Sequence, residues 1–311
     1  MITLFNIPSY EINTGNFSHL LHGQVVEDFE KQFCEYVGAK YACSINSATN
    51  AIFLTFLNKD LTVDVPSIIP PVVCNGIITG GNKVNFVDNV EWVGDSYILH
   101  QFEDYKVIDS AQKVMKNQFS LEANDEDLMI FSFYPTKPVG SCDGGIIVSN
   151  DFEKIKMFKE STLNGMTFSK DNWDRKIKFP GYKMYMNSVQ AQIATNNLEK
   201  LDYKNNKLSE ICHWYNKELN LNNSSNHLYR ISVDNRDEFI QLMREDGIQT
   251  GIHYTALHEN KVYNPDYINY LDLPYSSEEG RVTVSLPFHE NLTSQEIDKV
   301  VKKVNEHAIR N

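Results

Sequence analysis

Four short segments of the chain place reactive side chains where a predicted strand ends and a helix or loop begins. The first, Ser47-Ala48-Thr49, follows the apolar run KYACSIN and opens a helical stretch that reaches Leu57. The first turn of a helix has free backbone N–H groups and the positive end of the helix dipole, which together would receive a phosphate. An ordinary helix N-cap is the alternative for this segment taken alone.

The second and third segments supply a carboxylate and an amine. Asp109 follows the run YKVI, and the amide of Gln112 stands three residues further on, so both side chains can point into one crevice. Ser132 and Lys137 follow the run DLMIF and set a hydroxyl and an amine five residues apart in a loop. Ligands of open α/β sheets gather outside the carboxyl ends of the strands. A second helix cap and a solvated lysine are the alternatives.

The fourth segment, GIHYTALH, brings two imidazoles and a phenol together as His253, Tyr254 and His258. Two histidines five residues apart fit poorly as a metal pair on a helix, so we predict no metal site. Packing between domains is the alternative role for these three side chains.

Taken together, these segments contain the parts that a pyridoxal phosphate site requires. The aldehyde of this cofactor needs an amine for a Schiff base, and its pyridine nitrogen needs a carboxylate to stay protonated. Its phosphate needs N–H and hydroxyl donors. The chain supplies all three, in the expected order, at predicted strand ends.

The elements that must position these residues alternate in the first half of the chain. An amphipathic helix from Gly23 is closed by Gly38, and short apolar runs separated by helical segments follow it. We expect strands at the runs KYACSIN, PSIIP, KVNFVD, SYILH, YKVID, DLMIFSF and GGIIVSN. This order predicts an α/β fold with a mostly parallel sheet and helices on both faces.

The second half turns helical from Ser188 to Glu218 and then forms a smaller α+β unit. That unit contains LYRISV, the helix of RDEFIQLMREDG, the strand RVTVSLP and a final helix from Ser294. We therefore predict two domains, a larger α/β domain over residues 1–205 and a smaller α+β domain over residues 206–311.

Composition and charge exclude several classes of function. The 29 Lys and Arg residues against 41 Asp and Glu give a formal net charge of −12 without a basic cluster, which argues against nucleic-acid binding. No apolar run approaches the ~20 residues of a membrane span, and the start lacks a signal-peptide pattern, so we expect a cytoplasmic protein. The five scattered cysteines, without a CxxC, indicate reduced thiols.

The whole chain resembles the DegT/DnrJ/EryC1/StrS family of PLP-dependent nucleotide-sugar aminotransferases, a branch of the aspartate aminotransferase fold, fold type I. The resemblance rests on six segments: FEKQFCEYVGAKYACSINSATNAIF, VIDSAQ, SFYPTKPVGSCDGG, GYKMYMNSVQAQIATNNLEKLD, GIHYTALH and SLPFHENLT. It implies that Lys137 is the Schiff-base lysine, that Asp109 pairs with the pyridinium and that Gln112 bonds the phenolic oxygen of the cofactor. The remaining implied roles are phosphate binding by Ala48, Thr49 and Ser132, and contact with the neighbouring subunit of a homodimer by Lys183 and Tyr185.

The chain departs from the family pattern in three places. Ala48 stands where relatives usually have Gly. The stretch between Pro70 and Gly81 is short, and Val72, Val73 or Cys74 replaces the aromatic that relatives stack on the pyridine ring. Roughly one βα unit is missing between Asp88 and Asp109, where His100 and Phe102 are candidates to fill the space.

The resemblance implies transfer of an amino group from L-glutamate to a nucleotide-linked keto-deoxysugar, with His253, Tyr254 and His258 at the sugar. The spacing of the two histidines is similar to that in relatives that aminate C4, which favours an NDP-4-keto-6-deoxyhexose. A 3-keto-sugar aminotransferase and a catalytically impaired binding or regulatory protein are the alternatives. Lys137 argues against a dehydratase, because dehydrating relatives carry histidine there.

Overall fold

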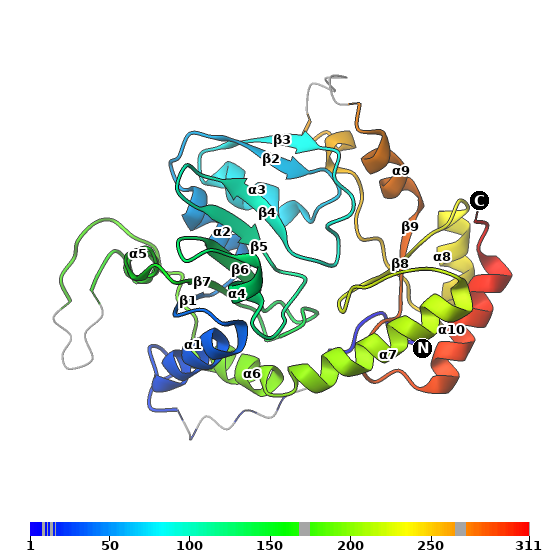
Figure 1. Ribbon diagram of the computed structural model, residues 1–311, viewed down its shortest axis with the longest axis horizontal. Coiled ribbons are helices and arrows are strands. Elements are labelled where there is room, and N and C mark those ends of the chain that lie inside the picture. The colour runs from blue at the N-terminus through cyan, green and yellow to red at the C-terminus, as the bar shows by residue number, and fades with distance from the viewer. Residues whose placement is uncertain are drawn as a thin grey trace.

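The computed structural model describes residues 1–7, 10, 12, 15, 17–167, 175–264 and 272–310. It has a larger part built around a five-stranded sheet and a smaller part that contains the C-terminus, and the long helix α7 runs from one part to the other (Figure 1). Among the described residues, none of the helices combines the length and the apolarity that a bilayer span requires.

The central sheet has the strand order β1-β7-β6-β5-β4. Its strands are β1 (Tyr41–Ile45), β4 (Tyr97–Gln101), β5 (Lys106–Asp109), β6 (Leu128–Ser132) and β7 (Gly145–Ser149). Strands β5 and β6 pair in parallel, whereas β7 is antiparallel to both β1 and β6, so β1, β5 and β6 share one direction. Strand β4 pairs antiparallel with β5 as a hairpin. The hairpin occupies the connection from which a βα unit was expected to be missing.

A separate two-stranded sheet joins β2 (Thr62–Pro66) and β3 (Lys83–Val87) in parallel. The prediction of a strand at PSIIP is wrong, because only Pro66 of that run lies in β2. The preceding residues form the strand because Val63 and Val65 alternate inward with exposed polar neighbours and pair along β3.

Helices cover both faces of the central sheet, as the sequence predicts. The helices of the larger part are α1 (Gln24–Val37), α2 (Ala48–Phe56), α3 (Pro71–Thr79), α4 (Gln118–Glu122), α5 (Phe152–Thr162) and α6 (Ser188–Leu198). Phe29 and Phe33 of α1 are fully buried, each contributing about 2–3 kcal/mol of burial free energy. Gly38 ends α1 with a φ of 79°, a left-handed conformation that glycine adopts without strain.

The smaller part packs helices against the antiparallel pair of β8 and β9. Its elements are α7 (Leu201–Leu219), β8 (Tyr229–Ser232), α8 (Arg236–Glu245), the 3-10 helix η2 (Leu257–Glu259), α9 (Pro274–Val282), β9 (Thr283–Leu286) and α10 (Ser294–His307). Tyr215, Tyr229 and Phe239 lie at the centre of its own hydrophobic cluster. The boundary at residue 205 stays a prediction, and that residue lies within α7.

Candidate active site

One cavity of about 500 Å³ collects most of the side chains that the sequence singled out. Its walls include the start of α2, the loops that follow β5 and β6, and the segment before η2. The predicted site residues that line it are Ala48, Thr49, Asp109, Gln112, Ser132, Lys137, His253 and Tyr254. The other three predicted site residues, Lys183, Tyr185 and His258, do not line this cavity.

Lys137 reaches the cavity from a turn that begins where β6 ends. Its backbone N–H donates to the carbonyl of Tyr134 at 2.8 Å, which closes the turn. Burial lowers the pKa of the Lys137 amine to about 8, and the nearby carboxylate of Asp109 opposes this shift. An appreciable fraction of the amine is therefore neutral near neutral pH, as a nucleophilic lysine requires.

Asp109 is the last residue of β5 and is only 3% exposed. Its Oδ1 accepts from the backbone N–H of Ala111 at 2.9 Å, and its Oδ2 accepts from the hydroxyl of Tyr97 at 3.0 Å. Burial raises the pKa of the Asp109 carboxyl, while these two donors and the Lys137 amine pull it back down. The two hydrogen bonds fix the carboxylate and favour its ionised form.

The start of α2 forms an anion cradle on one wall. Ser47 caps this helix by accepting from the N–H of Asn50 at 3.2 Å, so the N-cap expected as an alternative is present. The first N–H groups of a helix have no partner within it, and those of Ala48 and Thr49 belong to this turn. Gly145 makes room here, because a Cβ on it would lie 2.6 Å from the backbone nitrogen of Ala48.

Gln112 connects the larger part of the chain to the segment that precedes η2. Its side-chain carbonyl accepts from the N–H of Gly94 at 2.8 Å, and its amide group donates to the hydroxyl of Tyr254 at 3.0 Å. Both ends of the amide are held, so its orientation in the cavity wall is fixed.

The histidines of GIHYTALH occupy different surroundings. His253 lines the cavity, and its Nδ1 lies 2.8 Å from the Ser285 hydroxyl. Burial lowers the pKa of His253 to about 4, helped by Lys137 and Arg230, so the ring is neutral. His258 is buried away from the cavity, with its Nδ1 2.6 Å from the hydroxyl of Ser67.

Aromatic residues that the sequence analysis did not single out also line the cavity. Trp92 is buried there, and its indole N–H donates to the carbonyl of Ile68 at 3.0 Å. His227 is 6% exposed and its ring stacks on Phe5 with a centroid distance of 5.9 Å. Burial, reinforced by Lys137 and His253, holds the pKa of His227 well below its usual value. Trp92 and His227 lie in irregular segments, so no periodic pattern marks them.

The residues noted at the two shortened stretches, in place of the stacking aromatic and in the gap of the missing βα unit, lie in different surroundings. Val72 and Val73 of α3 line the cavity, whereas Cys74 does not. His100 and Phe102 also lie outside the cavity lining and contact the ring of Phe56.

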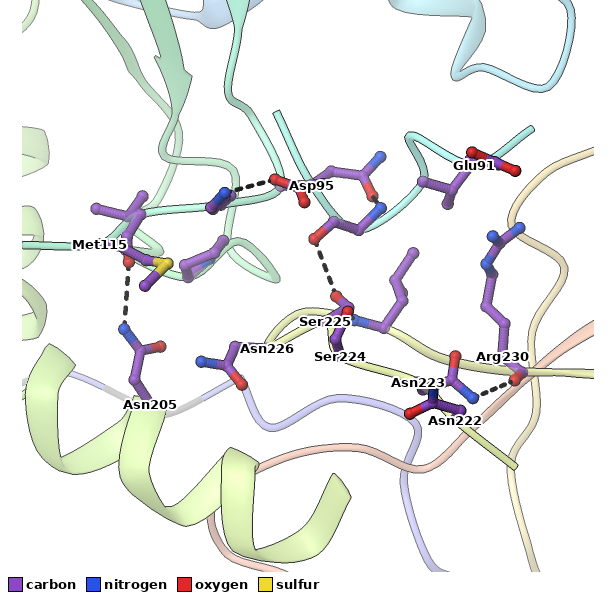
Figure 2. Close-up of a pocket in the computed structure, with 17 residues that line it drawn as sticks. Glu91, Asp95, Met115, Asn205, Asn222, Asn223, Ser224, Ser225, Asn226 and Arg230 are labelled. Carbon is purple, nitrogen blue, oxygen red and sulfur yellow. Dashed lines mark hydrogen bonds and ion pairs between the residues drawn. The ribbon is translucent and has the colours of Figure 1, made fainter. Parts of the chain in front are cut away.

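A second cavity has a volume of about 330 Å³ (Figure 2), and Gln112 lines both this cavity and the first. Polar side chains from both parts of the chain line it. The hydroxyl of Ser225 donates to the carbonyl of Gly94 at 3.0 Å, and the amide of Asn205 donates to the carbonyl of Val114 at 3.2 Å. The first bond ties the smaller part to the loop whose Gly94 N–H holds Gln112, and the second ties α7 to the loop that follows β5.

The chain is similar in sequence to known aminotransferases. The sequence model of the DegT/DnrJ/EryC1/StrS aminotransferase family matches residues 12–91 and 122–305. The chain is 26% identical to the UDP-4-amino-4,6-dideoxy-N-acetyl-beta-L-altrosamine transaminase of Campylobacter jejuni strain 81-176, over 88% of this chain and 87% of that protein.

Solved structures confirm the expected fold. Helicobacter pylori PseC, an aminotransferase involved in the biosynthesis of pseudoaminic acid, aligns with a TM-score of 0.79 at 19% identity, covering 98% of this chain and 99% of that one. A putative sugar aminotransferase of Streptococcus pneumoniae in its PLP-form aligns with a TM-score of 0.76 at 18% identity, covering 93% and 92% of the two chains.

Proposed function

Because the chain belongs to the DegT/DnrJ/EryC1/StrS aminotransferase family, we propose that it transfers an amino group from L-glutamate to a nucleotide-linked keto-deoxysugar, with pyridoxal 5'-phosphate as cofactor. The observation that carries this proposal is the meeting of Lys137, Asp109 and the start of α2 in one cavity. An amine, a carboxylate and an anion cradle there match the aldehyde, pyridine nitrogen and phosphate of that cofactor.

The residues of the cavity fit this group. The phosphate would lie at the first turn of α2, against the N–H groups of Ala48 and Thr49, with the hydroxyl of Ser132 as a further donor. Gln112 would face the phenolic oxygen. Trp92, Val72 and Val73 supply apolar walls in place of the single stacking aromatic of relatives.

When bound, pyridoxal phosphate supplies an aldehyde that condenses with amines and a ring that withdraws electrons. Lys137 supplies the amine that attaches the cofactor. Once the amino-acid substrate has taken its place on the cofactor, Lys137 Nζ would be free to accept the proton of the substrate α-carbon and to donate it again within the same site. An amine pKa of about 8 suits both uses, because the neutral and charged forms interconvert readily near neutral pH.

Asp109 would hold its negative charge beside the pyridine nitrogen of the bound cofactor. Its Ala111 and Tyr97 donors stabilise the carboxylate against the cost of burial. A fixed carboxylate holds a proton on the ring nitrogen, and this proton makes the ring an effective acceptor of electrons.

His253 and Tyr254 are the substrate-binding residues that we propose, since both line the cavity and present a neutral ring and a hydroxyl. The sugar we favour is an NDP-4-keto-6-deoxyhexose. The Campylobacter jejuni relative supports this choice, because its name places the amino group of its sugar at C4.

We further propose a cytoplasmic homodimer in which each subunit contributes to the site of the other. Lys183 is exposed, and Tyr185 packs on the ring of His22 with a centroid distance of 4.2 Å. Neither residue lines the cavity of its own subunit, and we propose that both contribute to the cavity of the neighbouring subunit.

The proposal is tested by incubating the protein, pyridoxal phosphate and glutamate with a panel of NDP-keto-sugars and weighing the products. Replacement of a keto oxygen by an amino group in one sugar, lost in Lys137→Ala, supports the proposal. NMR of the product then separates C4 from C3. Cofactor uptake without conversion of glutamate to its keto acid would contradict catalysis and favour a binding protein of the same fold.

A further inference from the structure

The hairpin of β4 and β5 places a tyrosine directly opposite the proposed ring-nitrogen partner. In this antiparallel pair the Cα of Tyr97 is aligned with that of Asp109. Residues opposite each other in an antiparallel pair project from the same face of the sheet. The family match stops at residue 91 and resumes at residue 122, so this hairpin lies in a stretch that the family model does not match.

The two side chains are joined by a buried hydrogen bond. The Tyr97 hydroxyl lies 3.0 Å from Asp109 Oδ2, and the two residues are 9% and 3% exposed. The ring of Tyr97 packs against that of Trp92 with a centroid distance of 4.5 Å. Trp92 is in turn held by its bond to Ile68, so the phenol has a fixed position.

The chemistry of the pair sets the direction of this bond. Burial, together with the charge of Asp109, raises the pKa of Tyr97 well above its usual value, so the hydroxyl keeps its proton. A protonated phenol beside a carboxylate can only donate to it. The second oxygen of Asp109 is already held by the N–H of Ala111.

We propose that Tyr97 is a positioning residue for Asp109. Its hydroxyl, which lies outside the cavity lining, holds the carboxylate in place and favours its ionised form. This inference rests on the proposed role of Asp109 beside the cofactor ring. The shortened connection between β3 and β5 therefore supplies a contact to the site and is more than a trimmed loop.

The test compares Tyr97→Phe, which removes only the hydroxyl, with Tyr105→Phe in the same hairpin. Tyr105 stacks on Phe102 outside the cavity and is the matched control. Two profiles are measured for each loaded protein: the pH dependence of the absorbance of bound cofactor and the pH dependence of kcat/KM.

Because the Tyr97 hydroxyl donates to the charged form of Asp109, its removal should raise the pKa of the Asp109 carboxyl. In Tyr97→Phe the acidic limb of both profiles should move up by about one pH unit, the effect expected for one hydrogen bond to a charged group. Tyr105→Phe should match the wild type. In Asp109→Asn, adding Tyr97→Phe should leave the absorbance unchanged.

The outcomes separate this inference from the proposed function. Wild-type protein that takes up no cofactor contradicts the function, whereas normal uptake with identical profiles in wild type and Tyr97→Phe overturns only the role of Tyr97. Folding is checked by circular dichroism. Should Tyr97→Phe not fold, Tyr97→His keeps a ring donor, which should hold the acidic limb in place or move it to lower pH, and a limb that moves to higher pH in that variant would count against a donor role.

Discussion

The side-chain amide of Gln112 donates a 3.0 Å hydrogen bond to the hydroxyl of Tyr254, 142 residues further along the chain. The bond joins the loop that follows β5 to the segment that precedes η2. Because the other end of the amide is held by the Gly94 N–H, the contact fixes how the two parts of the chain meet at the cavity. Gln112, which we propose binds the cofactor, and Tyr254, which we propose binds the sugar, thus hold each other in position.

Asp109→Asn should leave cofactor uptake intact and lower kcat by about 10²-fold, roughly 2.7 kcal/mol of transition-state stabilisation. A neutral amide fits the same space but no longer holds a proton on the ring nitrogen. Steady-state kinetics and the absorbance of bound cofactor measure the two effects separately. Near-normal turnover would refute the proposed role of Asp109.

The two histidines of GIHYTALH should respond differently to substitution. His253→Ala removes a ring from the cavity wall and should raise KM for the sugar about tenfold, while the reaction with glutamate alone proceeds almost unchanged. His258→Ala removes the ring that contacts the hydroxyls of Ser67 and Ser277, so it should lower the free energy of unfolding by about 1–3 kcal/mol and leave KM unchanged. Equal KM effects in both variants would contradict this assignment.

Cofactor-free protein should become more stable as the pH rises through the titration of Lys137. Burial lowers the pKa of this amine from 10.5 to about 8, so between these values the unfolded chain binds more protons than the folded one. The folded protein is destabilised in full by the charged Lys137 amine below about pH 8, and this destabilisation is lost as the pH rises to 10.5.

Lys137→Met removes the charge of a partly buried amine and should raise the free energy of unfolding by about 2 kcal/mol near neutral pH. It should also flatten the rise in stability between about pH 8 and pH 10. The exposed Lys116→Met serves as the control. Urea unfolding at several pH values measures both, and an unchanged slope in Lys137→Met would argue against a buried amine.

Mixing two inactive variants tests the shared site. A hybrid dimer of Lys137→Ala and Lys183→Ala subunits contains one site with both wild-type lysines. Equal mixing should therefore restore about one quarter of wild-type activity. No recovery despite demonstrated subunit exchange, with each variant inactive alone, would rule out a shared site at Lys183.

The site residues that follow regular strands could be predicted from the sequence. Strands β5 and β6 are parallel neighbours, so Asp109 at the end of one and Ser132 at the end of the other must lie at the same edge of the sheet. The apolar runs before them mark both strands clearly. This is why one cavity contains Asp109, Ser132 and Lys137, as expected.

The contribution of the connection between β3 and β5 could not be predicted. Its sequence predicts a short strand and a turn, and no local pattern indicates that this strand pairs antiparallel with β5. That pairing puts Tyr97 opposite Asp109 and brings Trp92 into the cavity wall. Likewise, His258 belongs to the same motif as His253 but is turned to Ser67, a partner 191 residues away.

The most direct test of the central claim is the identity of the lysine that binds the cofactor. The protein is loaded with pyridoxal phosphate, reduced with borohydride, digested and mapped by mass spectrometry. We predict a single pyridoxyl label on Lys137, in the peptide that contains SFYPTK, and no label in Lys137→Ala. A label on another lysine, or none in the wild-type protein, would contradict the assignment of this cavity as the active site.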